Sequence, residues 1–193
     1  MTKRDREDAT VQEYSRNVKH VGSFTHISSA IVLHPEKDRT HFHLIYATRN
    51  AKGVEVFKEA EKKAMPVMQQ ARGEARKRKR EEKTGQIELS LGEAAHDPTY
   101  FNSLRTRYID QAREAVSRLF QEKGRVSYDD VWSLALTFPM VWETDLHEWI
   151  HDWKSQGILE MTGLKTPMTK PKRDKGIFCA WQRPEAFPGD RRG

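Results

Sequence analysis

The sequence predicts an α+β protein in two parts, and three observations lead to that prediction. First, two apolar runs at 24–33 and 41–48 are separated by a polar loop, Pro35–Arg39, which is typical of a β-hairpin. Second, apolar residues at helical spacing follow the hairpin, from Val54 to Ala64. Third, three more helical patterns and two short strand-like runs come after a highly charged segment.

The first part also contains a helix before the hairpin. It is expected to end at Gly22, and its apolar residues recur at helical spacing: Val11, Tyr14, Val18 and Val21. Asn50–Gly53 is expected to end the second strand. Pro66 is expected to break or kink the helix that follows near Met65, because proline has no N–H to donate.

Both strands of the hairpin are apolar on more than one face, as in a sheet that is covered on both sides. An isolated hairpin is only marginally stable in water. We therefore expect this hairpin to self-associate or to pair with another chain.

Three segments of the first part resemble a known family: Gly22–Phe24, Phe42–Thr48 and Gly53–Lys58. Over roughly residues 11–65, and more weakly as far as Gln182, the chain resembles the C-terminal part of the catalytic domain in the three-Cys-motif partner (TcmP) family. The segments that match are structural rather than catalytic. They therefore indicate ancestry more than activity.

The resemblance implies both a fold and a set of partners. Residues 1–66 would be the closing hairpin and helix of a Rossmann-type, methyltransferase-like domain, and a winged helix would follow. The half of that domain that binds the cofactor would be missing from this chain. The candidate partners that follow are a radical-SAM-like protein bearing three cysteines and a separate chain that supplies the missing Rossmann half.

The second part is predicted, independently of that resemblance, to be a winged helix-turn-helix domain. Amphipathic helices are expected from about Leu104, after the capping residue Ser127, and after Thr144. Short strands at 158–161 and 176–181 would form the wing. Three helices followed by a two-stranded wing is the element order of winged helices.

These patterns divide the chain into four segments. Residues 1–66 contain the hairpin and its helix, and residues 67–98 are a basic helix or linker. Residues 99–183 are the winged helix domain, and residues 184–193 are a disordered tail.

Composition limits the location and the partners of the protein. The net charge of +6 and the pI of about 9.4 are compatible with nucleic acid or acidic proteins as partners. The single cysteine, Cys179, excludes an intrachain disulfide and a metal site built from a cysteine cluster. The charged N-terminus is not a signal peptide, and no run approaches the roughly 20 apolar residues of a membrane span. We expect a cytoplasmic protein with no membrane contact.

Catalytic signals are missing from the sequence. A Rossmann methyltransferase holds S-adenosylmethionine on a glycine-rich turn, yet no two glycines here are two positions apart. We expect no cofactor, no catalytic residue and no enzymatic activity from this chain alone. Cys179 is expected to be a buried apolar residue. The histidines His34, His41 and His43 are more typical of packing at a sheet edge than of a metal site.

Nine basic residues are candidates for nucleic-acid binding, because phosphate contacts need clustered Lys and Arg. They are Arg76, Lys77, Arg78, Lys79 and Arg80 in the basic segment, and Lys170, Lys172, Arg173 and Lys175 in the wing. For the basic segment the alternative is a solvated helix or linker. The presumed recognition helix is acidic, with Glu143, Asp145, Glu148 and Asp152 against Lys154, so it should repel phosphate.

Two functions remain open at this point. The first is a non-catalytic C-terminal module of a TcmP-like protein, which binds DNA, RNA or a partner protein through the winged helix. The second is one chain of a split S-adenosylmethionine-dependent methyltransferase, with the cofactor half on another polypeptide.

Overall fold

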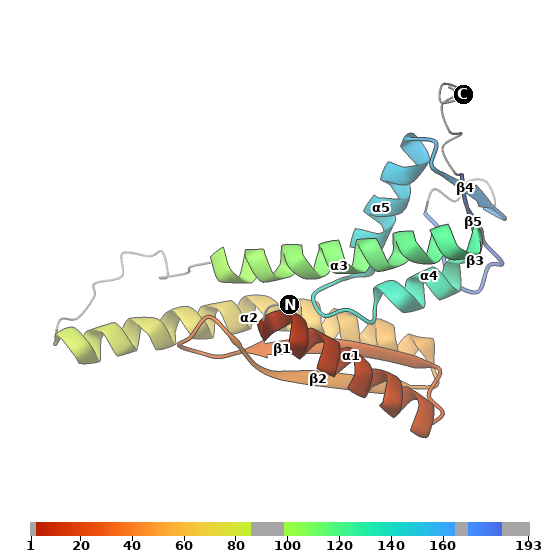
Figure 1. Ribbon diagram of the computed structural model, residues 1–193. Coiled ribbons are helices and arrows are strands. Elements are labelled where there is room, and N and C mark those ends of the chain that lie inside the picture. Colours follow the sequence, from red (N-terminus) through yellow and green to blue (C-terminus); the bar gives the residue numbers. More distant parts are fainter. Residues whose placement is uncertain (1–2, 86–98, 165–169, 183–193) are drawn as a thin grey trace, which may run out of the picture. The chain divides into compact units, whose positions relative to one another are not determined.

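The computed structural model describes residues 3–85, 99–164 and 170–182, and it contains both helices and strands, with the strands in two small sheets (Figure 1). The predicted tail at 184–193 lies outside the described residues, as does the part of the predicted linker from residue 86 to residue 98. The chain forms two compact units. The first is Met1–Ile109 with Leu136–Val141, and the second is Asp110–Ala135 with Trp142–Gly193.

The first unit confirms the predicted hairpin. Helix α1 (Lys3–Val21) precedes strands β1 (His26–Leu33) and β2 (Thr40–Thr48), and helix α2 (Ala51–Thr84) follows them. The strands pair antiparallel from His26 opposite Thr48 to Val32 opposite Phe42, with one irregularity between Val32 and Leu33. Asn50 caps α2 by accepting a hydrogen bond from the Lys52 N–H.

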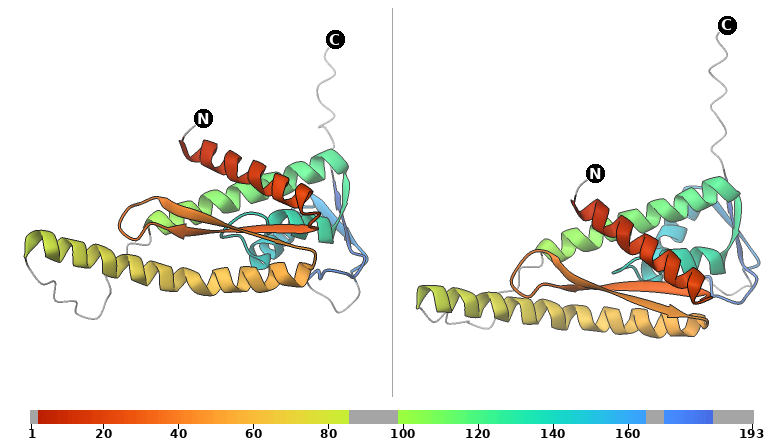
Figure 2. Two further views of the ribbon diagram at one scale, coloured as in Figure 1. Left: turned by 90° about the horizontal axis from the view of Figure 1, so that it is seen from below. Right: turned by 60° about the horizontal axis from the view of Figure 1, so that its bottom comes forward.

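The hairpin lies between α1 and α2 (Figure 2). Side chains alternate between the two faces of a strand. Tyr46 stacks on Phe57 of α2, with the ring centroids 5.0 Å apart, whereas His43 points to the other face, where its Nε2 lies 3.2 Å from Glu7 of α1. β1 is buried at every residue from Ile27 to Ile31, but β2 has no fully buried residue.

The predicted break at Pro66 is wrong, because α2 continues through it to Thr84. Proline removes only one backbone donor, and Pro66 lies on the exposed side of the helix. Met65 before it is buried, as are Arg72 and Gly73 after it, so the helix is packed on both sides of the proline. The basic segment is therefore the last part of this helix rather than a separate linker.

The segment Leu136–Val141 belongs to the first unit. The Ser28 and Ser29 hydroxyls donate to the carbonyls of Leu136 and Thr137, each at 2.6 Å. The buried Lys58 ammonium donates to the Phe138 carbonyl at 2.6 Å. These hydrogen bonds satisfy carbonyl groups that a loop would otherwise bury without partners.

Helix α3 (Thr99–Lys123) contributes to both units, which divide between Ile109 and Asp110, whereas the sequence analysis starts the second domain at residue 99. The N-terminal part of α3 is tied to α1. Arg107 pairs with Asp8 at 2.6 Å, and the buried Tyr108 hydroxyl also donates to Asp8.

The second unit contains the rest of α3, β3 (Arg125–Ser127), α4 (Tyr128–Ala135), α5 (Glu143–Ser155), β4 (Leu159–Thr162) and β5 (Phe178–Trp181). Its three antiparallel strands lie in the order β3-β5-β4. The sequence analysis did not predict β3, which precedes α4 directly. Ser127 caps α4 as predicted, since its hydroxyl accepts from the Asp130 N–H at 3.1 Å.

An aromatic cluster forms the core of the second unit. Phe120 stacks on Trp181 at 5.3 Å between centroids, and Trp153 meets both rings edge-on. Trp132 and Trp149 are also buried. Among the described residues, no helix has both the length and the apolar character that a membrane span requires.

Candidate binding groove on helix α5

Helix α5 buries one face in the core of the second unit. Leu146, Trp149, Ile150 and Trp153 form that face. Asp145 is buried as well, and its carboxylate accepts a hydrogen bond from the Trp142 N–H at 2.8 Å, which satisfies a free donor at the start of the helix. Asp145 is therefore a capping residue, although the sequence analysis counted it among the acids that would face phosphate.

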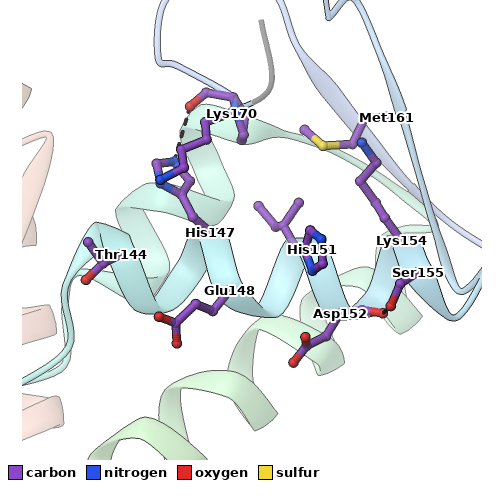
Figure 3. A pocket seen from close by; sticks show the side chains of 11 residues that line it. Thr144, His147, Glu148, His151, Asp152, Lys154, Ser155, Met161 and Lys170 are labelled. Atoms are coloured by element: carbon purple, nitrogen blue, oxygen red, sulfur yellow. Dashed lines mark hydrogen bonds between the residues drawn. The ribbon is translucent and has the colours of Figure 1, made fainter.

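Helix α5 also lines a cavity of about 650 Å³, mostly with polar residues and with Ile150 (Figure 3). One wall is Met161 of β4, and another is the segment Lys170–Pro171. Ile150 and Pro171 are themselves buried, so with Met161 they give the cavity an apolar surface. Its polar residues come mainly from α5: Thr144, His147, Glu148, His151, Asp152, Lys154 and Ser155. We call this cavity the α5 groove.

His147 joins Lys170–Pro171 to α5. Its Nε2 lies 3.3 Å from the Pro171 carbonyl oxygen and 3.0 Å from the Tyr128 hydroxyl, and its ring stacks on Tyr128. Burial is the main cause that lowers the pKa of His147 below 6.5, although Glu143 opposes the shift. His147 is therefore neutral at pH 7, and its Nε2–H can donate to the Pro171 carbonyl.

Burial also raises the pKa of the Tyr128 hydroxyl, and the nearby Glu143 carboxylate adds to that shift. Tyr128 therefore stays protonated, and it donates to Glu143 at 3.2 Å. Glu143, another of the predicted phosphate-facing acids, thus has a partner within the unit. The Asp152 carboxylate lies 3.6 Å from the Arg113 guanidinium of α3. Glu148 is the most exposed of the four acids.

His147, Glu148 and His151 match the H-E-x-x-H spacing, which the sequence analysis passed over. In zinc peptidases, two histidines spaced in this way bind the metal and the glutamate acts as a base. Here the His147 Nε2 is engaged by Pro171 and Tyr128. Across 3–85, 99–164 and 170–182, no three His, Cys, Asp or Glu side chains are grouped to hold a metal. The geometry therefore favours a structural role for His147.

The predicted basic residues of the wing differ in their environments. The Arg173 side chain is only 15% exposed, and its guanidinium lies 4.4 Å from the centroid of the Trp132 ring. This cation–π contact packs the Arg173 side chain against the core, so Arg173 is not a free phosphate ligand. Lys170, Lys172 and Lys175 are exposed, and Lys170 borders the α5 groove.

The basic residues of α2 also differ from one another. Arg76 pairs with Asp38 of the hairpin loop, and Lys79 pairs with Glu36 of the same loop. Lys77 lies 3.8 Å from Glu81 within the helix. Arg78 and Arg80 are exposed. Arg76 and Lys79 of the basic segment thus hold the hairpin loop, although Lys79 is still exposed to solvent.

Cys179 is fully buried in β5, and burial raises the pKa of its thiol to about 12. The thiol is therefore protonated at neutral pH and packs as an apolar side chain, as the sequence analysis predicted.

Comparisons of the chain with protein-family models, with curated proteins and with solved structures find no significant match.

Proposed function

We propose that this chain is a non-catalytic binding module whose second unit is a winged helix and binds a partner protein through the α5 groove. The order of elements from α3 to β5 and the strand order β3-β5-β4 support the winged-helix assignment. In this assignment α5 is the third helix, and β4 and β5 form the wing. The observation on which the proposal rests is the α5 groove, which places an apolar surface beside the exposed face of that helix.

The chemistry of the groove favours protein over nucleic acid. Glu148 and Asp152 border it, and carboxylates repel the phosphates that supply most nucleic-acid affinity. The Ile150–Met161–Pro171 surface instead suits an apolar side chain of a partner, surrounded by polar residues. Hydrophobic centres with polar rims are the usual anatomy of protein interfaces.

The resemblance to the TcmP family suggests which protein the partner is. In this proposal the first unit is the remnant of a Rossmann-type domain, and the partner is a radical-SAM-like protein bearing three cysteines. The hairpin packed between α1 and α2 is compatible with that assignment.

Calorimetry with the purified three-cysteine, radical-SAM-like protein from the same source tests the proposal. Met161→Asp should weaken binding at least about tenfold, because it places a charge in the apolar surface. Gln156→Ala is the matched control, since Gln156 is exposed at the end of α5 and does not line the groove. Equal affinities for both variants would contradict the groove as the binding site.

Nucleic acid is the second candidate partner, and the three exposed lysines of the wing favour it. Lys170, Lys172 and Lys175 lie within six residues of chain, so they could contact neighbouring phosphates. A DNA or RNA ligand would then be held mainly by the wing rather than by base contacts from α5.

A split S-adenosylmethionine-dependent methyltransferase is the alternative from a different class. It is supported by the resemblance and by the unpaired outer side of β2 among the described residues. Calorimetry with S-adenosylmethionine distinguishes it. The chain alone should give no saturable heat, whereas a split enzyme should bind the cofactor once the second polypeptide is added.

A further inference from the structure

The charged residues that line the α5 groove are divided between two sides of helix α5. Figure 3 shows Lys154 and Lys170 on one side of the helix, and Glu148 and Asp152 pointing to the other side. The Asp152 carboxylate lies 3.6 Å from the Arg113 guanidinium, so it already has a cationic partner within the unit. The groove therefore has one basic side and one acidic side.

The apolar surface of the groove lies on the basic side. His147, His151 and Lys154 follow one another at intervals of four and three residues, so they form one stripe along α5. This stripe lies on the same side of the helix as Met161 of β4, and the Lys154 side chain extends toward Met161 (Figure 3). A ligand in contact with Met161 would therefore meet cations before it met a carboxylate.

The two lysines of the groove have no acidic partner within the described parts of the chain. Both side chains are exposed, and none of the ion pairs among residues 3–85, 99–164 and 170–182 includes Lys154 or Lys170. Arg113 and Arg173 of the same unit are instead held by Asp152 and by the Trp132 ring. Lys154 and Lys170 thus leave two positive charges beside the groove available to a ligand.

This arrangement indicates the chemistry of the ligand. An apolar surface with a cation on either hand is complementary to an apolar group that lies between anionic groups. A peptide segment with an apolar side chain between Asp or Glu residues has that chemistry. A nucleic-acid strand offers phosphates but no aliphatic side chain for Met161, and its continuous charge would also meet Glu148.

We propose that the α5 groove selects an acidic segment of its partner protein, in which an apolar side chain contacts Met161 and flanking carboxylates pair with Lys154 and Lys170. This inference rests on the proposed function, because it names the kind of segment that the same groove would bind. It does not depend on which protein carries that segment.

Three synthetic peptides of equal length test the proposal on the full chain. Each has a central Leu, and they differ in having Glu, Gln or Lys on both sides of it. By fluorescence anisotropy at low salt, the Glu peptide should bind at least about tenfold more tightly than the Lys peptide, with the Gln peptide between them. Equal affinities for the Glu and Lys peptides, or no saturable binding of the Glu peptide at millimolar concentration, would overturn the proposal.

Two double variants locate the charges that make the selection. Lys154→Glu with Lys170→Glu should reverse the preference, so that the Lys peptide binds more tightly. Lys172→Glu with Lys175→Glu is the matched control, because it changes the net charge equally at two exposed lysines that do not line the groove. The control should still prefer the Glu peptide. The reversal is a gain of binding, which an unfolded variant could not imitate, and equal preferences in the two double variants would contradict the proposal.

Met161→Gln separates this inference from the proposed function, because it removes apolar surface without adding charge. The Glu peptide should bind this variant at least about threefold more weakly. If all three peptides bind the wild-type chain equally and all lose affinity in Met161→Gln, the groove is a protein-binding site that does not select acidic segments, and only this inference fails. If Met161→Gln binds the Glu peptide as tightly as the wild-type chain does, the proposed function fails as well.

Competition with an oligonucleotide tests the other class of ligand. A single-stranded oligonucleotide should not displace the Glu peptide at low salt. Displacement that Lys172→Glu with Lys175→Glu weakens would show that the wing and the groove hold phosphates together, and the choice of an acidic protein segment would be wrong.

Discussion

The two units bury very different groups at their centres. In the first unit, Lys58 and Glu61 of α2 form an ion pair at 2.8 Å with both side chains buried, and together they bind the segment Leu136–Val141. In the second unit, Phe120, Trp153 and Trp181 pack ring against ring. A buried ion pair holds its two side chains in one geometry, and the loss of either partner is strongly destabilising. An aromatic cluster stabilises the fold through the large apolar area that it buries.

The ion pair gives the largest expected effect. Lys58→Met should destabilise the first unit by about 3–5 kcal/mol, because it leaves the Glu61 carboxylate buried without its cation. Lys58→Met with Glu61→Gln should recover much of that loss, since Gln keeps an acceptor for the Met140 N–H and removes the charge. Urea unfolding of both variants measures the difference. A double variant no more stable than the single one would contradict the charge argument.

Truncating one ring of the aromatic cluster should destabilise the second unit, and no second substitution should restore the loss. Phe120→Ala should cost about 3 kcal/mol or more, because it opens a cavity beside Trp153 and Trp181. Tryptophan fluorescence reports this directly, since both tryptophans lie in the same unit. Phe120→Leu is the control, as it retains most of the volume and should cost less.

The two units also differ in their basic residues, which lie at the end of α2 in the first unit and in the wing of the second. If nucleic acid binds, replacing Lys170, Lys172 and Lys175 by Ala should make the plot of log binding constant against log salt concentration less steep by about 3. It should weaken binding to all nucleic-acid sequences equally. Replacing Arg76 and Lys79 should change the slope less, because their charges are paired with Asp38 and Glu36. Arg173→Ala should lower stability instead. No binding at low salt would favour a protein partner.

Local patterns predicted most of the elements, and long-range contacts account for what they missed. The hairpin followed from apolar runs around a Pro-containing loop, and the helices followed from periodicity and caps. The continuation of α2 through Pro66 depends on Met65 and Arg72 packing against distant residues, which no local rule includes. β3 was missed because three residues are too short for a strand pattern.

The α5 groove could be predicted only in part. The exposed stripe of α5 follows from helical spacing, and its acidic character was recognised. The wall at Lys170–Pro171 was not, because it depends on a contact between His147 and a carbonyl 24 residues away. Likewise Asp145 and Arg173 carry charges that suggest surface roles, yet one caps a helix and the other stacks on Trp132.

The smallest expected effect is a pH dependence that distinguishes His147 from the exposed His151. The folded state lowers the pKa of His147 below its unfolded value of 6.5, so the neutral form is favoured in the folded protein. Its contribution to stability is complete above pH 6.5 and is lost as the pH falls through the folded pKa. His147→Gln should therefore flatten the decline in stability of the second unit below pH 6.5, whereas His151→Gln should not. Urea unfolding at several pH values measures this. The opposite pattern would mean that the contacts with Tyr128 and Pro171 favour the charged ring.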